Sequence, residues 1–288
     1  MEIQPLLSIG IPTYNRPDGL EKVLNYLVNQ EYQNIEIIVS DNSSSNTRVK
    51  EILEHYAAQD HRIKYFIQSE NIEIEPNFNF VYSKCLGDYF MWMSDDDAFS
   101  QNYIAECISF LETNNDFLLC SGISFYYNSN VSRQKENPIT LDSKWPLIRL
   151  LFYFLRVNKN GLFYGVYRKS YKFNCPIKKH IGSDWCYIAK ISLLGKIKTI
   201  DACEIHRSND GGSSSRTKIV KRWNAKGFKK IFIESYTAHQ IASNLFSDNI
   251  TKYKYSISKR FLIQFFVFIL LNLKFLGNSI SRRIVWSQ

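Results

Sequence analysis

The first hundred residues alternate between short apolar runs and amphipathic stretches, and this alternation constrains the fold more than any other feature. The apolar, β-branched runs lie at 6–11, 35–39, 63–67 and 89–93. The stretches with apolar residues at helical spacing lie at 20–27, at 49–56 and in a segment that ends near residue 84. Strands that alternate with helices of this length imply βαβ crossovers. We therefore predict an α/β fold with a mostly parallel central sheet flanked by helices.

Polar side chains follow three of these predicted strands at the point where each strand ends. They belong to Thr13-Tyr14-Asn15-Arg16, Asp41-Asn42 and Ser94-Asp95-Asp96-Asp97. In open α/β sheets, ligands bind beyond the carboxyl ends of the strands. We therefore expect the three segments to line one crevice.

The rest of the chain extends this domain and then changes in character. Further strands are predicted at 117–127 and 161–168, and further helices at 104–112, at 185–194 and from 218 onward. The length of 288 residues fits one large domain with an appendage, because single cores stop growing at about 250 to 300 residues. We place the domain at 1–215 and a helical, basic extension at 216–288.

The net charge of +9 is concentrated in the C-terminal quarter. Residues 216–288 contain 14 Lys and Arg against Glu234 and Asp248, a net charge of +12, whereas residues 1–215 have a net charge of −3. Such asymmetry points to an anionic partner, either a membrane surface or a nucleic acid. The chain has no zinc-finger, basic-zipper or RNA-binding signature, so we expect no nucleic-acid partner.

The cysteines and the N-terminal residues favour a cytoplasmic protein. No two of the cysteines have metal-ligand spacing, which predicts reduced thiols. They are Cys85, Cys107, Cys120, Cys175, Cys186 and Cys203. The chain begins Met-Glu-Ile-Gln-Pro, with no apolar run that could serve as a signal peptide.

Three consecutive aspartates, Asp95 to Asp97, directly follow a predicted buried strand. Carboxylates this close repel and raise one another's pKa, and a divalent cation relieves the repulsion. Carboxylate and diphosphate oxygens are hard ligands that suit magnesium or manganese. The alternative is a solvated acidic turn or a helix N-cap, which Ser94 and Asp95 could also supply.

Asp41 also ends a strand, and it precedes Asn42 and three serines. As a purely structural residue it would stabilise an Asx turn or cap the next helix. As a functional residue it would accept a hydrogen bond from a nucleobase or a ribose hydroxyl.

These segments carry motifs that follow one another in a fixed order. They are Leu7-Ser-Ile-Gly-Ile-Pro-Thr-Tyr-Asn-Arg16, Ile35-Glu-Ile-Ile-Val-Ser-Asp-Asn-Ser43 and Gly87-Asp-Tyr-Phe-Met-Trp-Met-Ser-Asp-Asp-Asp97. Together they resemble the successive motifs of the inverting, GT-A-fold family 2 glycosyltransferases. The resemblance implies a Rossmann-like GT-A domain whose residues 1–100 bind a nucleotide sugar and whose residues 101–215 bind the acceptor.

The resemblance also implies roles for individual residues. The Pro-Thr-Tyr-Asn loop and the aspartate that ends the second strand would bind the nucleoside, and the D-x-D element would bind a metal on the diphosphate. The predicted nucleotide-binding residues are Pro12, Thr13, Tyr14, Asn15, Arg16, Asp41, Asn71 and Asp96. The predicted cofactor is a divalent cation, Mn²⁺ or Mg²⁺, with Asp95, Asp97 and His206 as ligands.

One loop departs from the family pattern. Relatives commonly have Asn-x-Gly after the third strand, but this chain has Asn71-Ile-Glu73. The loop therefore lacks glycine's freedom to adopt a positive φ. Asn71, Asn77 and Asn79 are the weaker candidates for donor contacts.

Two segments farther along complete the predicted site. Ile181-Gly-Ser-Asp-Trp-Cys-Tyr-Ile-Ala-Lys-Ile-Ser-Leu-Leu-Gly195 is similar to the family segment in which an acidic residue opens a helix and serves as catalytic base, which implies Asp184. The alternative role of Asp184 is an N-cap for a helix that begins at Trp185. His206 precedes a Gly/Ser-rich run, where the resemblance implies a loop that closes over the donor. The alternative is a linker with a surface histidine.

The resemblance implies an inverting glycosyltransferase that moves a sugar from a nucleoside-diphosphate sugar to a hydroxyl of a glycan or lipid-linked glycan, as in bacterial O-antigen or capsule synthesis. One alternative is a sugar-phosphate nucleotidyltransferase, but residues 12–16 contain no Gly-rich phosphate loop. The other is a non-catalytic nucleotide-sugar-binding protein, although all the expected carboxylates are present.

The last predicted helix, at 261–276, is strongly apolar and is flanked by basic residues. These are Lys259, Arg260, Lys274, Arg282 and Arg283. With about 16 residues it is shorter than the roughly 20 that a membrane-spanning helix needs. We therefore predict peripheral binding to an anionic membrane surface, on the inner face of the cytoplasmic membrane. The alternative is a buried helix that packs on the domain or on a second subunit.

Overall fold

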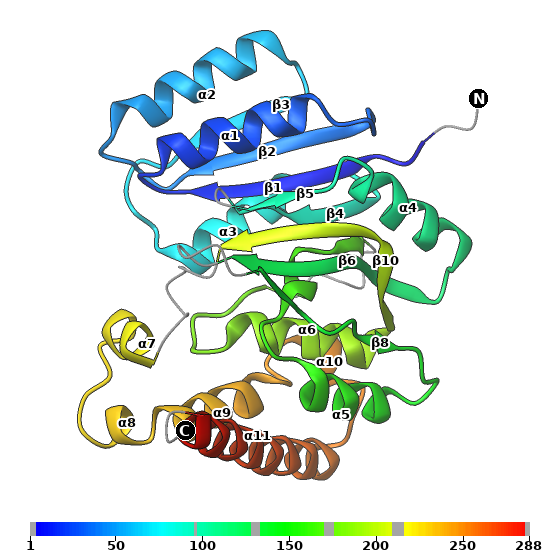
Figure 1. Cartoon of the computed structure of the whole chain (residues 1–288), viewed down its shortest axis with the longest axis vertical. Coiled ribbons are helices and arrows are strands. Elements are labelled where there is room, and N and C mark those ends of the chain that lie inside the picture. Colours follow the sequence, from blue (N-terminus) through cyan, green and yellow to red (C-terminus); the bar gives the residue numbers. More distant parts are fainter. Residues whose placement is uncertain (1–3, 95–96, 128–132, 170–175, 209–215, 286–288) are drawn as a thin grey trace.

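The computed structural model describes residues 4–94, 97–127, 133–169, 176–208 and 216–285 (Figure 1). Over these residues, ten strands form one mixed sheet. Eight of them follow the order β3-β2-β1-β4-β9-β6-β10-β5, with β7 beside β6 and β8 beside β10. Helices cover both faces, which confirms the predicted α/β class.

The N-terminal half is built from βα units that run parallel. Its strands are β1 (Leu7–Thr13), β2 (Ile35–Asp41), β3 (Ile63–Ile67) and β4 (Tyr89–Trp92). Its helices are α1 (Pro17–Val28), α2 (Thr47–Gln59) and α3 (Ile74–Lys84). β2 and β4 flank β1 and pair with it in parallel. β1, β2 and β4 are buried along almost their whole length, because helices pack against both faces of the sheet.

The second half adds antiparallel strands, so the sheet is less parallel than predicted. Its strands are β5 (Ala98–Phe99), β6 (Phe117–Tyr127), β7 (Arg133–Lys135), β8 (Thr140–Leu141), β9 (Val166–Arg168) and β10 (Lys196–Ser208). Its helices are α4 (Tyr103–Thr113), α5 (Pro146–Arg156), the 3₁₀ helix η1 (Gly161–Tyr164) and α6 (Ser183–Leu194). β9 lies antiparallel between β4 and β6, whereas β10 runs parallel to β6.

Three predictions for this half need correction. The strand predicted at 161–168 is a 3₁₀ helix followed by the short β9, because a distant carboxylate binds the backbone of this turn, as described below. α5 was not predicted, although its apolar residues have helical spacing. No strand was predicted around His206, but it lies in β10, where β5 and β6 pair with it. The Gly/Ser-rich loop predicted after it, at 209–215, lies outside the described residues.

The residues after 215 fold back onto the domain. They form α7 (Arg216–Arg222), α8 (Phe228–Ile231), α9 (Ile233–Asn244), α10 (Asn249–Lys252) and α11 (Ile257–Val285). α9 and α11 gather with α5 and α6 on one side of the sheet (Figure 1), and buried Ile241, Val267 and Leu271 belong to the same apolar core as Tyr153 and Ile188. α11 has 29 residues, so the terminal helix is longer than the 16 predicted. The boundary at residue 215 stays a prediction.

Candidate active site

The ends of β1, β2 and β4 lie side by side, as the sequence predicted. Thr13 lies opposite Asp41 in the parallel register, and the amide of Asn42 donates to the carbonyl of Thr13 at 3.0 Å. On the other side of β1, the amide of Met93 donates to the carbonyl of Gly10 at 2.9 Å. This pairing brings the three predicted polar segments to one edge of the sheet.

Asp41 is buried and organises the turn after β2. Its two carboxylate oxygens each lie 3.2 Å from the amide nitrogen of Ser44, and the Ser44 hydroxyl donates to Oδ1 as well. Asp41 thus stabilises the turn after β2, which was its alternative, structural role. Its predicted contact with a nucleoside would add to these bonds.

Asn15 joins the first loop to the second. Its side-chain oxygen accepts from the amides of Ser45 at 2.9 Å and Asn46 at 3.2 Å, and its own amide donates to Ser44 Oγ at 2.7 Å. The backbone of Asn15 has a φ of 53°, a conformation that asparagine adopts more readily than most residues. Asn15 therefore shapes the loop from within.

The remaining residues of the first loop differ in exposure. Tyr14 is 46% exposed at the end of β1. Pro12 is a partly buried residue of β1, and Arg16 precedes α1, where its carbonyl accepts from the amide of Leu20 at 3.0 Å. Tyr14 thus presents an exposed aromatic ring next to the end of β1.

Asn71 accepts a hydrogen bond from the loop that follows β2. Asn42 Nδ2 donates to Asn71 Oδ1 at 3.1 Å, and Asn42 Oδ1 accepts from the amide of Ile72 at 2.9 Å. Glu73 has a φ of 72° and a ψ of 174°, a region that is essentially reserved for glycine. Glu73 therefore has a positive φ without a glycine's freedom, and its backbone is strained.

Asn77 and Asn79 make contacts within the protein. Asn77 is buried and exchanges hydrogen bonds with Ser40, through Ser40 Oγ at 2.6 Å and the Ser40 carbonyl at 3.1 Å. Asn79 pairs with the backbone of Ile177 at 2.8 and 2.9 Å. These side chains stabilise the loops on either side.

Asp97 is the one residue of the predicted D-x-D element that lies within the described part of the chain; Asp95 and Asp96 lie outside it. Its side chain is 2% exposed and pairs with Arg207, whose Nε lies 2.9 Å from Oδ2. β5 begins at the next residue and pairs with β10 at His206, which brings Asp97 and Arg207 together. The pairing of β5 with β10 thus holds the buried carboxylate of Asp97 next to Arg207 of β10.

Arg207 was not among the predicted site residues. One guanidinium nitrogen donates to the hydroxyl of Tyr126 at 3.2 Å, and the guanidinium carbon lies 4.0 Å from the centre of the Tyr164 ring. Burial alone would lower the pKa of Arg207, but the charge of Asp97 and the two tyrosines raise it well above its usual value. Its position after His206 was visible in the sequence, but nothing local showed that its partner lies 110 residues away.

His206 makes a separate cluster. Its Nδ1 lies 2.9 Å from the hydroxyl of Tyr127, and its Nε2 lies 3.5 Å from Glu204 Oε2. Burial lowers the pKa of His206, which the charge of Glu204 partly opposes. Successive side chains of a strand point to opposite faces, so His206 faces away from the side on which Arg207 meets Asp97. Among the described residues, no three His, Cys, Asp or Glu side chains form a group that could hold a metal.

Asp184 lies in the first turn of α6, two residues after the N-cap position, which Gly182 occupies. The helix begins at Ser183 after Gly182, so the alternative role of Asp184 as N-cap is wrong. Its Oδ2 accepts a hydrogen bond from Asn160 Nδ2 at 3.1 Å. Asn160 is 1% exposed, and its Oδ1 accepts from the buried hydroxyl of Tyr153 at 3.0 Å. Two buried side chains therefore orient the Asp184 carboxylate.

Glu136 holds the backbone that carries Asn160. Its carboxylate accepts from the amides of Lys159, Asn160 and Gly161, each at 3.0 Å. A side chain at position 161 would lie 1.9 Å from Ser124 Oγ, so this close approach requires glycine. These three bonds hold residue 160 in its left-handed conformation and begin η1, which is why the predicted strand does not form here.

The same carboxylate connects Asp184 to Asp97. The Tyr126 hydroxyl donates to Glu136 Oε2 at 3.1 Å while it accepts from Arg207. One chain of hydrogen bonds therefore leads from Asp97 through Arg207, Tyr126 and Glu136 to the turn of Asn160 and on to Asp184. The two carboxylates that the sequence singled out belong to one partly buried polar network, which restricts how far either can move.

An α/β sheet with carboxylates and polar loops at the carboxyl ends of its strands belongs to the class of open α/β folds that bind ligands at that edge. The chain belongs to glycosyl transferase family 2, because the model of this family matches residues 8–198.

Among relatives, the chain is similar to the GalNAc(5)-diNAcBac-PP-undecaprenol beta-1,3-glucosyltransferase of Campylobacter jejuni, with 37% identity over 95 residues, which are 32% of this chain and 30% of the relative. It is also similar to the abequosyltransferase RfbV of Salmonella typhimurium, with 34% identity over 119 residues, 40% of this chain and 35% of the relative. The chain thus spans about a third of the length of these relatives.

Solved structures show the same fold. A mannosyltransferase of Pyrobaculum calidifontis, PcManGT in complex with GDP-Man and Mn²⁺, superposes with a TM-score of 0.58 at 12% identity, covering 97% of this chain and 76% of the other. TarS 1-349 of S. aureus in complex with UDP-GlcNAc superposes with a TM-score of 0.58 at 16% identity, covering 93% and 81%. Both likenesses confirm the predicted GT-A-type fold.

Proposed function

We propose that this glycosyltransferase transfers one sugar, with inversion, from a nucleoside-diphosphate sugar to a hydroxyl of a lipid-linked glycan. The observation that carries the proposal is the network that joins Asp97, at the nucleotide edge of the sheet, to Asp184, at the start of α6. A transfer of this kind needs one carboxylate near the leaving diphosphate and another near the attacking hydroxyl.

Asp184 is the base of the proposed reaction. Its carboxylate takes the proton of the acceptor hydroxyl while the oxygen attacks the anomeric carbon and the bond to the nucleoside diphosphate breaks on the opposite face. Asn160 donates to one carboxylate oxygen, which holds the group in a fixed orientation for the acceptor. No covalent sugar-enzyme intermediate is formed.

A divalent cation, Mn²⁺ or Mg²⁺, fits the carboxylates at this edge. Asp95 and Asp97 would hold it, with Asp96 beside them, and when bound it would stabilise the charge of the departing diphosphate. Arg207 donates to Oδ2 of Asp97. A carboxylate has two oxygens, so Asp97 can bind the guanidinium group and the divalent cation at the same time. Since His206 faces the other side of β10, the described geometry supports Arg207 rather than His206 as the residue beside this carboxylate.

The nucleoside would lie against the loops that follow β1 and β2. Thr13, Asp41 and Asn42 are held together there by backbone pairing, and the exposed ring of Tyr14 could cover a base. In this proposal Asn15 and Asn71 act by shaping the two loops, and the remaining predicted residues of the first loop, Pro12 and Arg16, act in the same way.

The names of the relatives support the kind of acceptor. One relative is named for a glycan on undecaprenyl diphosphate and another for the transfer of abequose. We therefore propose a role in building a bacterial surface polysaccharide, such as an O-antigen or capsule repeat, on a lipid carrier.

A panel of nucleotide sugars tests the proposed function. We expect one nucleoside-diphosphate sugar to raise the melting temperature in the presence of Mn²⁺ or Mg²⁺, since a ligand at a hundred times its Kd stabilises the folded state by about 2.7 kcal/mol. The Asp97→Asn variant and a chelator should both remove most of this shift. A panel without any metal-dependent shift would contradict the proposal.

The described basic residues of the C-terminal quarter support peripheral membrane binding. Both acidic residues of this region are already paired, Glu234 with Arg216 at 3.4 Å and buried Asp248 with Lys190 at 3.0 Å. The exposed cations beyond them include Lys221, Lys226, Lys229, Lys230, Lys252 and Lys259. Each cation near an anionic leaflet contributes about 1 kcal/mol.

α11 presents an apolar stripe on its outer face. The exposed side chains of this stripe are Phe261, Leu262, Phe265, Phe266, Ile269, Leu273 and Leu276. Residues Ile257–Gly277 are long and apolar enough to cross a membrane. However, Val267 and Leu271 of the opposite face are buried in the core, and Lys274 Nζ turns inward to the carbonyl of Phe154 at 2.8 Å. This docking favours a helix that lies along the membrane surface.

Vesicle sedimentation tests this membrane proposal. The full chain should sediment with vesicles that contain anionic lipid and be released by salt, and the combined Phe261→Ser, Phe265→Ser and Leu273→Ser variant should stay in the supernatant. Leu86→Ser, at an equally exposed leucine outside the C-terminal quarter, is the matched control and should still sediment. A full chain that remains soluble at every anionic lipid content would rule out the idea.

A further inference from the structure

Lys274 of α11 caps the C-terminal end of α5. Its ammonium group donates to the carbonyls of Phe154 at 2.8 Å and Leu155 at 3.2 Å, and also to the carbonyl of Val157. The last carbonyls of a helix have no partner within the helix, and a cation at this end interacts favourably with the helix dipole. An ammonium group has three donors, so Lys274 can satisfy all three carbonyls at once.

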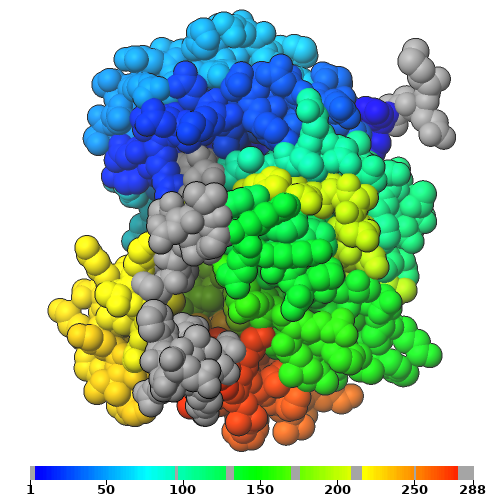
Figure 2. All heavy atoms as spheres, in the orientation of Figure 1, coloured from blue at the N-terminus to red at the C-terminus, as the bar shows by residue number. Residues whose placement is uncertain are grey.

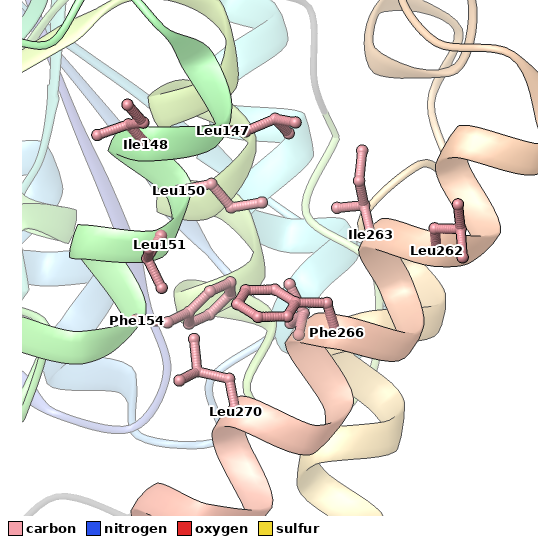
Figure 3. Close-up of a pocket in the computed structure, with 10 residues that line it drawn as sticks. Leu147, Ile148, Leu150, Leu151, Phe154, Leu262, Ile263, Phe266 and Leu270 are labelled. Carbon is pink, nitrogen blue, oxygen red and sulfur yellow. The ribbon is translucent and has the colours of Figure 1, made fainter.

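Apolar side chains also hold α11 against α5. Figure 3 shows Phe154 of α5 lying beside Phe266 and Leu270 of α11. In Figure 2 the orange and red atoms of α11 lie at the surface, next to the green atoms of the segment that contains α5. Lys274 therefore reaches inward, with a charged group, from a helix that lies at the surface.

The end of α5 leads directly to the residues that orient Asp184. Tyr153 lies next to the capped carbonyls and donates to Asn160 Oδ1 at 3.0 Å, and Asn160 Nδ2 donates to Asp184 at 3.1 Å. Burial lowers the pKa of Lys274 to about 8, a shift that the charge of Glu136 partly opposes. Lys274 is therefore still mainly charged at neutral pH, and it lies near the carboxylate that binds the turn of Asn160.

Lys274 also contacts the helix that carries Asp184. Its Nζ lies 5.6 Å from the centre of the Trp185 ring, within the range of a cation–π contact, and the centre of the Phe275 ring lies 6.1 Å from that of Trp185. Trp185 follows Asp184 in the first turn of α6. One side chain of α11 therefore touches both α5, which holds Asn160, and α6, which carries the carboxylate.

We propose that Lys274 is a positioning residue for the transfer reaction and that α11 completes the active site, by fixing the turn of Asn160 and the first turn of α6. The inference rests on the proposed role of Asp184 as base. It gives α11 a second role besides the proposed membrane binding, because the contacts of Lys274 lie on the side of α11 that faces the domain. Loosening α11 at Lys274 should therefore slow the reaction even where no membrane is present.

Lys274→Met, compared with Lys259→Met, tests this role in solution without lipid. Both variants remove one positive charge from α11, but Lys259 is exposed. The assay follows hydrolysis of the nucleotide sugar that gives the largest thermal shift, with water as the acceptor. We expect Lys274→Met to lower kcat about 10- to 100-fold and to leave the KM for the donor unchanged, because misplacing a catalytic group by about 1 Å can cost about 100-fold. Lys259→Met should retain full kcat.

Chemical rescue tests whether the ammonium group itself is required. Lys274→Cys should lose kcat to the same extent as Lys274→Met. Alkylation of this cysteine with 2-bromoethylamine, in which the thiolate displaces bromide, rebuilds a side chain of lysine's length that ends in an ammonium group, and it should restore most of kcat. The cysteines that the structure describes are buried, so the same treatment should leave the wild-type rate unchanged.

Hydrogen exchange of the full chain gives a measurement that needs no substrate. Lys274→Met should speed exchange at least tenfold at the amides of residues 159–161, which Glu136 binds, and at the amide of Cys186, which donates to the carbonyl of Gly182. The amides of β1 and β2 should exchange at the wild-type rate. A change confined to these turns would show that the substitution acts locally and not by unfolding the domain.

The proposal would be overturned by unchanged kcat in Lys274→Met, by equal losses in Lys274→Met and Lys259→Met, or by alkylation that restores nothing. Unchanged exchange at residues 159–161 would overturn it as well. Asp184→Asn in the same hydrolysis assay separates the two proposals: a rate that this substitution leaves unchanged would contradict the proposed base, whereas a rate lowered by Asp184→Asn but not by Lys274→Met would contradict the positioning role alone.

Discussion

Asp184→Asn is expected to lower kcat by about 1,000-fold, because a positioned general base contributes roughly 10²- to 10⁴-fold and an amide cannot take the acceptor's proton. The substitution keeps the size of the side chain and an oxygen that can still accept from Asn160 Nδ2, so the start of α6 should be preserved. The KM for the donor and the melting temperature should therefore change little. The measurement is steady-state transfer together with nucleotide binding by calorimetry.

Ser183→Ala is the matched control, since Ser183 is the preceding residue of the same helical turn. We expect it to retain nearly full kcat. Loss of nucleotide binding and of folded protein in Asp184→Asn would assign a structural role to Asp184 and contradict its role as base. Tyr153→Phe removes the hydroxyl that holds Asn160, and it should lower kcat by a smaller factor without changing nucleotide affinity.

Arg207→Met is expected to lower the free energy of unfolding by about 3 to 5 kcal/mol, because it leaves the buried charge of Asp97 without its partner. The side chains of this pair are only 15% and 2% exposed, so solvent screens the charge weakly. The same change removes the donor to Tyr126 and thereby interrupts the network that leads to Glu136. Urea denaturation at neutral pH measures the effect.

Arg133→Met provides the comparison for Arg207→Met. Arg133 pairs with Glu204 at 2.7 Å on the same sheet, but the two side chains are 48% and 39% exposed, and removing such a pair should change stability by no more than about 1 kcal/mol. The double variant Asp97→Asn with Arg207→Met should recover part of the lost stability, since the unpaired charge is gone. Equal losses for the two arginine variants would show that the Asp97 pair is not effectively buried.

The N-terminal half was predictable because its signals are local. Each strand is an apolar run, each helix has its own apolar face, and parallel strands bring their carboxyl ends to one edge. Thr13 and Asp41, at the ends of β1 and β2, therefore lie side by side as the sequence predicted.

The second half was less predictable because distant groups decide its backbone. Residues 161–168 have the composition of a strand, but the carboxylate of Glu136 binds three successive amides at 159–161 and forces a turn. β10 was not predicted, because its pairing with β6 joins residues far apart in the chain. Hydrogen bonds of this kind leave no periodic pattern in the sequence.

The sequence by itself determined the family and the order of the motifs, because both depend on residue types at short spacing, and it singled out two carboxylates, Asp97 and Asp184. Only the tertiary structure decided what surrounds these carboxylates. It placed Arg207 rather than His206 beside Asp97, because neighbouring residues of a strand face opposite sides. It also joined Asp97 to Asp184 through Glu136, because a buried polar group takes its partners from whichever segments the fold brings within hydrogen-bond distance.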